Sequence, residues 1–158
     1  MGDEEEANPV AVQLGEDPEA PGEGSIRAWV RAALTGIPDG APPGEVVVRV
    51  ADEDEMTSLN GEFRGKQAPT NVLSFPADLP EGPWEAVLGD IVICPSVVAR
   101  EAADQGKGLE AHWAHMVVHG VLHLLHYDHQ EVEEAERMEG LERSILAGLG
   151  YGDPYAEE

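Results

Sequence analysis

Apolar residues recur along the chain at spacings that predict several helices. In residues 25–34, apolar side chains stand three or four positions apart: Ile26, Trp29, Val30, Ala33 and Leu34. This spacing places them on one face of a helix, and Ser25 stands where an N-cap is expected. Residues 96–106 and 109–125 also have helical patterns. The last helix, in residues 131–150, is predicted to turn six apolar side chains inward: Val132, Ala135, Met138, Leu141, Ile145 and Leu149.

Runs rich in valine and isoleucine predict the strands of a sheet. Residues 45–52 and 86–94 contain the apolar, β-branched runs that suit strands. Prolines at both ends of residues 69–76 predict a short edge strand or an irregular one. Residues 10–15 are a candidate edge strand.

A short helix is predicted between the first two valine-rich runs. Asp52, with Glu55 three residues later, resembles a capping box, and the end of this helix carries Arg64. Strands and helices therefore interleave along the chain, without internal repeats. This order predicts an α/β (α+β) fold, a single compact domain in which a small mixed sheet is packed with helices.

The first residues differ in composition from the rest. Residues 1–24 contain eight acids, no base and three prolines, which predicts an acidic, partly disordered N-terminal segment before a single domain in residues 25–158. No apolar run approaches the roughly 20 residues of a membrane helix, and the acidic start lacks the basic residues of a signal peptide. We therefore expect a cytoplasmic protein. The single cysteine, Cys94, lies in an apolar run and is predicted to be buried and inert.

The charge balance bears on possible partners. The chain has 32 acidic and 9 basic residues, a net charge of −23. Such a surface argues against binding nucleic acid, which depends on cationic groups that displace counterions from phosphates. One hypothesis is a salt-rich cytoplasm, because the Debye length falls to about 3 Å near 1 M salt. Molar KCl would then stabilise the fold, or at least not destabilise it.

A cluster of histidines near the end of the fourth predicted helix indicates a metal site. His119 and His123 stand four residues apart, so in a helix both can direct a ring nitrogen at one point. His129, six residues later, can supply a third ligand from beyond the helix end. Three histidines leave the fourth corner of a zinc tetrahedron to water, as catalytic sites require. The pattern predicts one Zn²⁺ per chain.

Two other uses of these histidines stay open at this point. The same spacing occurs in metzincin peptidases, but the glutamate that serves those enzymes as general base is here Gly120. A peptidase would have to recruit another base, such as Asp128. The second alternative is a structural zinc, with His126 as a fourth ligand, although closed sites commonly include cysteine. His112 and His115 continue the same helix face and are predicted to be structural.

Three sequence blocks resemble the YbeY endoribonucleases, which are bacterial rRNA maturation factors. HMVVHGVLHLLHYDH, residues 115–129, is similar to the family signature H-G-x-L-H-L-x-G-Y-D-H. LNGEFRGKQAPTNVLSFP, residues 59–76, and LGDIVI, residues 88–93, match two further family segments in the same order. The resemblance implies a single α/β domain that cleaves RNA and binds one zinc ion through His119, His123 and His129. The spacing argument indicates the same three residues.

The resemblance also implies a functionally important arginine at Arg64. A guanidinium suits a phosphodiester because its planar fork can hold phosphate oxygens and stabilise developing charge. Glu62 is the only acid between residues 60 and 77, so Arg64 and Lys66 can form a local cationic strip in an otherwise acidic chain. His126 replaces a family glycine. This change predicts mild backbone strain, a fourth metal ligand, or a ring that lines the substrate cleft.

The resemblance therefore predicts a zinc-dependent hydrolase in residues 25–158. It implies a single-strand-specific endoribonuclease for rRNA maturation, in late small-subunit processing, and for ribosome quality control. Precursor rRNA and the small ribosomal subunit are the expected partners, with no membrane. Arg64 would hold the phosphate, and Asp128 would orient a histidine or the water. The alternatives are a metallopeptidase-like hydrolase and a non-catalytic ribosome-assembly factor with a structural zinc.

Overall fold

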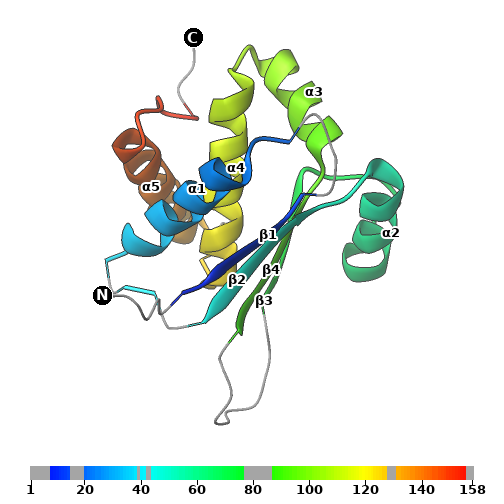
Figure 1. The fold of residues 1–158 in the computed structure, drawn as a ribbon. Coiled ribbons are helices and arrows are strands. Elements are labelled where there is room, and N and C mark those ends of the chain that lie inside the picture. Colours follow the sequence, from blue (N-terminus) through cyan, green and yellow to red (C-terminus); the bar gives the residue numbers. More distant parts are fainter. Residues whose placement is uncertain are drawn as a thin grey trace.

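The helices and strands follow one another in the order that the sequence predicts. The computed structural model describes residues 8–14, 20–38, 40–41, 44–76, 87–127 and 131–155. Its helices are α1 (Glu23–Thr35), α2 (Glu53–Arg64), α3 (Pro95–Gln105), α4 (Leu109–Leu124) and α5 (Val132–Gly148). Its strands are β1 (Val10–Gln13), β2 (Glu45–Val50), β3 (Val72–Pro76) and β4 (Val87–Ile93). Figure 1 shows their arrangement.

The strands form one mixed sheet in the order β1-β2-β4-β3. Strands β1 and β2 are parallel, as are β2 and β4, whereas β3 runs antiparallel to β4. Strand β1 lies at one edge of the sheet, and the proline-bracketed β3 lies at the other. The predicted α/β fold with a small mixed sheet is confirmed.

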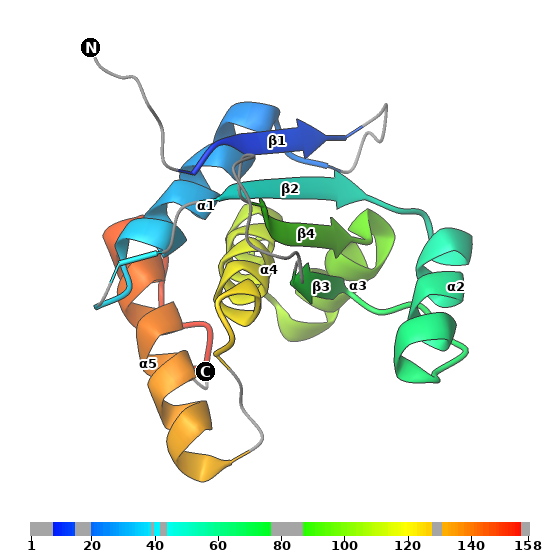
Figure 2. The same ribbon diagram turned by 90° about the horizontal axis from the view of Figure 1, so that it is seen from below.

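Helices cover both faces of the sheet, with different residues beneath them. Helices α1, α4 and α5 lie on one side and α2 lies on the other (Figures 1 and 2). Because side chains alternate along a strand, Ile91 and Ile93 join the core under α1 and α4, whereas Val92 joins a smaller core with Met56 of α2. Residues on α4 and on α2 therefore act from opposite faces of the sheet.

The N-terminal ends of α1 and α2 test the predicted caps. Asp52 caps α2 as predicted, because its carboxylate accepts a hydrogen bond of 2.8 Å from the Glu55 amide. Helix α1 buries the five predicted apolar side chains, but its N-cap is Gly22 and not Ser25. The helix begins earlier at Glu23, whose carboxylate suits the positive end of the helix dipole and pairs with Arg27.

The buried face of α5 is only partly the predicted one. Met138 and Ile145 are buried, whereas Val132 is 74% exposed and the predicted inward orientation is wrong there. The reason is that the first turns of α5 extend beyond the core (Figure 2), and residues 131–134 are exposed. Glu142, which is not among the side chains predicted to turn inward, is fully buried.

Two further predictions concern single features of the chain. Cys94 is completely buried, as predicted. None of the described helices combines the length and the apolar character needed to cross a membrane. Residues 1–7 and 15–19 lie outside the described residues, so the boundary at residue 24 and the disorder before it stay predictions.

Candidate metal centre

Four histidines form a row along one side of α4. They are spaced by three, four and four residues, and their neighbouring ring centroids lie 6.1, 6.2 and 4.6 Å apart along the series His112, His115, His119 and His123. The first two rings are buried and the last two are partly exposed. The shortest separation joins His119 and His123, the pair that the helical spacing predicts to share one ligand.

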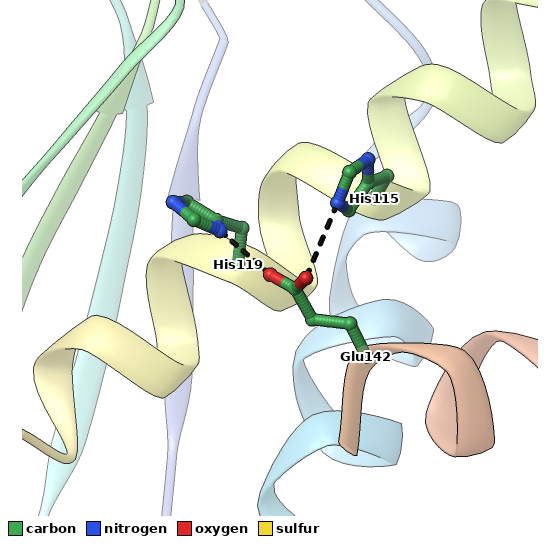
Figure 3. A group of neighbouring side chains, drawn as sticks. All are labelled: His115, His119 and Glu142. Atoms are coloured by element: carbon green, nitrogen blue, oxygen red, sulfur yellow. Dashed lines mark hydrogen bonds and ion pairs between the residues drawn. The ribbon is translucent and has the colours of Figure 1, made fainter. Parts of the chain in front are cut away.

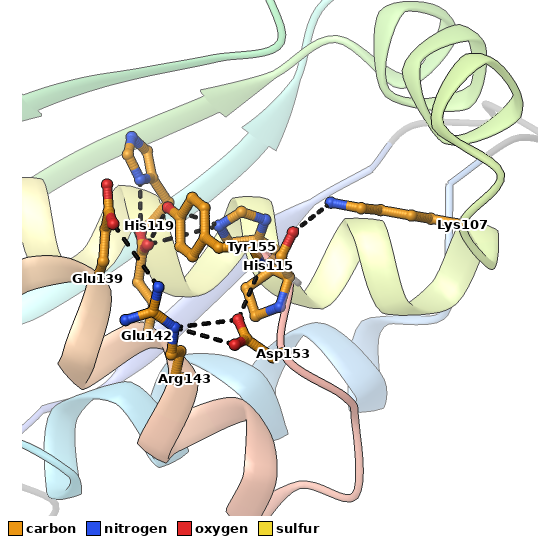
Figure 4. A network of polar contacts seen from close by, with 9 residues as sticks. Lys107, His115, His119, Glu139, Glu142, Arg143, Asp153 and Tyr155 are labelled. Atoms are coloured by element: carbon orange, nitrogen blue, oxygen red, sulfur yellow. Dashed lines mark hydrogen bonds and ion pairs between the residues drawn. The ribbon is translucent and has the colours of Figure 1, made fainter. Parts of the chain in front are cut away.

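A buried carboxylate from α5 contacts the middle of this row. Glu142 is 0% exposed, and its Oε2 lies 2.6 Å from His119 Nδ1. Its Oε1 lies 3.6 Å from His115 Nε2 and accepts a hydrogen bond from the Tyr155 hydroxyl. Figure 3 shows the carboxylate between the two rings, and Figure 4 shows Tyr155 beside it. Glu142 therefore connects α4, α5 and the segment that follows α5.

The Glu142 carboxyl group is ionised. Burial raises its pKa, but the His115 ring close by and the hydrogen bonds from His119 and Tyr155 outweigh this effect and hold the pKa at about 2. Burial and the neighbouring carboxylate raise the pKa of Tyr155, so its hydroxyl keeps its proton. Since an ionised carboxylate only accepts hydrogen bonds, His119 must carry its proton on Nδ1. The lone pair of the neutral ring is then on Nε2.

His115, His119 and Glu142 together could hold a metal ion, because one ligand atom from each lies within 4.8 Å of the others. Two atoms bound to one tetrahedral zinc ion at about 2.0–2.1 Å lie roughly 3.3 Å apart. The 2.6 Å separation between His119 and Glu142 is instead that of a strong hydrogen bond. Metal binding by these three residues would require this contact to open, whereas binding through His119 Nε2 would not.

The other predicted residues of this site lie at or beyond the end of α4. His129 and Asp128 fall outside the described residues, so their roles stay predictions. His126 is exposed and has a φ of 72°. This left-handed conformation is what the family glycine would adopt at low cost, so the predicted backbone strain is present at His126.

Arg64 ends α2 and is exposed. The next residue, Gly65, has a φ of 74°, and its amide donates to the carbonyls of Asn60 and Gly61, which stops the helix. The buried Asn60 side chain donates 2.8 Å to the Ala68 carbonyl and so holds the following loop. Arg64 forms no ion pair with another described residue.

Arg64 and the histidine row belong to helices that pack on opposite faces of the sheet. Arg64 belongs to α2 and the histidines belong to α4, with the edge strand β3 between the two helices (Figure 2). Arg64 and the histidines are therefore carried by helices on different sides of β3.

Gly120, which stands where metzincin peptidases have their catalytic glutamate, faces the sheet. A Cβ atom at Gly120 would lie 2.9 Å from Ile91 Cγ2 on β4. A glutamate there would extend into the core under α4. The fold therefore provides no room at this position for the general base of a metzincin.

Two residues of the polar network were missed by the sequence reasoning. Glu142 stands four residues after Met138 and three before Ile145, so it occupies the apolar stripe of α5. An acidic residue within an apolar stripe could have indicated a buried polar contact, because a buried charge needs partners. Tyr155 gave no local signal, since its partner is 13 residues away in the sequence and on another element.

Comparisons with known proteins agree with the sequence blocks. The family model described as Endoribonuclease YbeY matches residues 18–150. A relative of that name from Xanthomonas axonopodis pv. citri is 58% identical over 138 residues, which are 85% of this chain and 84% of the relative. Another from Halorhodospira halophila is 55% identical over 141 residues, 87% of this chain and 90% of that protein.

A solved structure has the same architecture. The solution structure of TM1509 from Thermotoga maritima aligns with a TM-score of 0.59 and 26% identity. The alignment covers 94% of this chain and 99% of that protein.

Proposed function

Because this chain belongs to the YbeY endoribonuclease family, we propose that it is a metal-dependent, single-strand-specific endoribonuclease. Its proposed substrate is precursor rRNA, in late maturation of the small ribosomal subunit and in ribosome quality control. The proposed location is the cytoplasm. The observation that carries the proposal is the pairing of His119 and His123, whose ring centroids lie 4.6 Å apart beside the buried Glu142.

We assign the metal to His119, His123 and His129. The described residues fit a zinc ion because two imidazoles share one helix face and the Glu142 hydrogen bond leaves the lone pair of His119 on Nε2. His129 would complete the set from beyond α4. A zinc ion held there would supply a Lewis acid for the phosphate and lower the pKa of water at the site.

The remaining roles belong to residues around the histidines. The Arg64 guanidinium would hold the phosphodiester by its planar fork and stabilise charge that develops during cleavage. To reach both Arg64 and the histidines, a single strand of RNA would cross the edge strand β3. Asp128 would orient a histidine or the attacking water. With a net charge of −23, general affinity for RNA would be weak, and the small subunit would supply additional contacts.

The test is cleavage of a small-subunit rRNA fragment by the purified protein. Wild type is compared with chelator-treated enzyme, with enzyme after zinc is restored, and with His123→Ala purified in the same way. We expect cleavage by wild type only, lost with chelator and recovered with zinc. Equal cleavage by His123→Ala would indicate a contaminating nuclease and contradict the proposal. RNA that is bound but not cut, together with unfolding on metal loss, would support a structural zinc instead.

A further inference from the structure

The segment after α5 is tied to the histidine row through one buried carboxylate. Glu142 accepts hydrogen bonds from His119 Nδ1 and from the Tyr155 hydroxyl, so each oxygen has a partner of its own. The Tyr155 oxygen lies 3.3 Å from His115 Nε2. Since the Tyr155 proton is directed at Glu142, its oxygen must accept from His115 Nε2–H.

These contacts assign opposite tautomers to two histidines one turn apart. His115 carries its proton on Nε2, and its Nδ1 is buried without a partner among the described residues. His119 carries its proton on Nδ1. Of these two rings, His119 is the one whose Nε2 lone pair lies on the ring edge turned away from Glu142, in the orientation that a metal ligand on this helix requires.

The segment that carries Tyr155 is itself fixed at several points. Two contacts anchor it: Lys107 Nζ donates to the Pro154 carbonyl (2.7 Å), and Arg143 Nε donates to both Asp153 oxygens (3.1 Å each). The Arg143 guanidinium also lies 5.3 Å from the centre of the Tyr155 ring. Figure 4 shows this network around the histidines. The hydroxyl of Tyr155 is therefore held at one place relative to Glu142.

We propose that Glu142 and Tyr155 are positioning residues for the metal centre, and that the segment 153–155 acts as a clamp that holds His119 in the tautomer and orientation for binding zinc through Nε2. This inference rests on the proposed function, because it takes His119 as a metal ligand, and it extends the site to a segment 36 residues away in the sequence. A role in packing alone would make the same contacts but would leave metal affinity unchanged.

Tyrosine variants separate these two roles. Tyr155→Phe removes one oxygen atom from a partly exposed side chain, so the fold should persist. Tyr151→Phe is the matched control, because the Tyr151 hydroxyl also donates to a carboxylate, that of Glu110 in the first turn of α4, but lies outside the clamp and does not contact Glu142. Zinc dissociation constants are measured by competition with a chromophoric chelator, and thermal unfolding is measured on both proteins.

We expect Tyr155→Phe to weaken zinc binding about 10-fold and Glu142→Gln to weaken it by roughly 10- to 100-fold, the range for partners of metal-bound histidines. Tyr151→Phe should bind zinc as wild type does, with a melting temperature close to that of Tyr155→Phe. Unchanged zinc affinity in Tyr155→Phe, or an equal loss in Tyr151→Phe, would overturn the clamp.

A second readout needs neither metal nor RNA. Long-range ¹H–¹⁵N NMR spectra of the metal-free protein, recorded at a pH where the rings are neutral, report the tautomer of each histidine. We expect Nδ1–H for His119 and Nε2–H for His115, with both tautomers of His119 populated in Glu142→Gln. An Nε2–H tautomer of His119 in wild type would overturn the inference. Failure to cut RNA, with affinities and tautomers as expected, would count against the proposed function alone.

Discussion

Ser74 on the edge strand β3 donates a hydrogen bond of 2.9 Å from its hydroxyl to the backbone carbonyl of Gly120 on α4. This contact lies in the turn between His119 and His123. A Cβ atom at Gly120 would also lie 3.4 Å from the Ser74 hydroxyl oxygen, so the absence of a side chain allows the helix to approach the sheet. The hydrogen bond and the close packing at Gly120 therefore fix the distance between β3 and the turn of α4 that carries His119 and His123.

The close approach at Gly120 predicts the effect of adding a methyl group. Overpacking against Ile91 costs about 1–3 kcal/mol, and the better helix propensity of alanine returns about 1 kcal/mol. We expect Gly120→Ala to lower the free energy of unfolding by roughly 1 kcal/mol in urea titrations. Gly140 is the control, since a Cβ there meets nothing within 4 Å, and Gly140→Ala should stabilise the protein. Equal effects of the two substitutions would show that α4 does not approach the sheet this closely.

Arg64 belongs to α2 and the histidine row to α4, which predicts that RNA cleavage and metal binding respond differently to the loss of Arg64. Arg64→Ala should lower kcat/KM for RNA cleavage by about 100-fold, the typical cost of one charge-stabilising donor, and leave zinc affinity unchanged. Arg64→Lys should recover only part of the rate, because lysine lacks the planar fork. The control is Arg137→Ala, an exposed change on α5. A loss of zinc binding in Arg64→Ala would contradict these roles.

The left-handed backbone of His126 predicts that glycine stabilises this position. Removing the side chain relieves about 1–2 kcal/mol of strain, partly offset by the larger entropy of glycine in the unfolded chain. We expect His126→Gly to raise the free energy of unfolding by roughly 0.5 kcal/mol in urea titrations. Zinc affinity measured by chelator competition should not change. Weaker zinc binding would identify His126 as a fourth ligand.

Burial of His112 predicts a loss of stability in mild acid. Burial lowers the pKa of His112, and the nearby His115 and Lys107 lower it further. The Glu101 carboxylate on α3 raises the pKa but does not cancel the effect of burial. The unfolded chain takes up the His112 proton near the ordinary pKa of about 6.5, whereas the folded protein takes it up only at lower pH. The unfolded state then binds more protons, so stability falls as pH decreases below about 6.5.

His112→Phe tests this origin. Urea titrations of metal-free wild type and variant at about pH 7.5 and about pH 5.5 should give a smaller decrease for the variant, since His112 no longer titrates. Equal decreases in the two proteins would assign the acid sensitivity to other groups.

Local patterns in the sequence predicted the elements and part of the site, but not the contacts between elements. The apolar face of α1 and the Asp52 cap follow from spacings of three and four residues, and so does the pairing of His119 with His123. The sequence did not predict the buried Glu142, because periodicity identifies a helix face from its apolar residues alone. Its burial depends on donors from α4 and from the segment after α5, which no local pattern relates to it.

The burial of Glu142 also affects how α5 can dock on α4. Sliding α5 by one helical turn, about 5.4 Å, would leave the carboxylate among apolar side chains without its two donors, His119 and Tyr155. An unpaired buried charge costs several kcal/mol, so alternative alignments of the two helices are penalised. We expect a variant with leucine in place of Glu142 to retain helical content while α5 samples more than one docked position. The same ionised group would then select a single native register during folding.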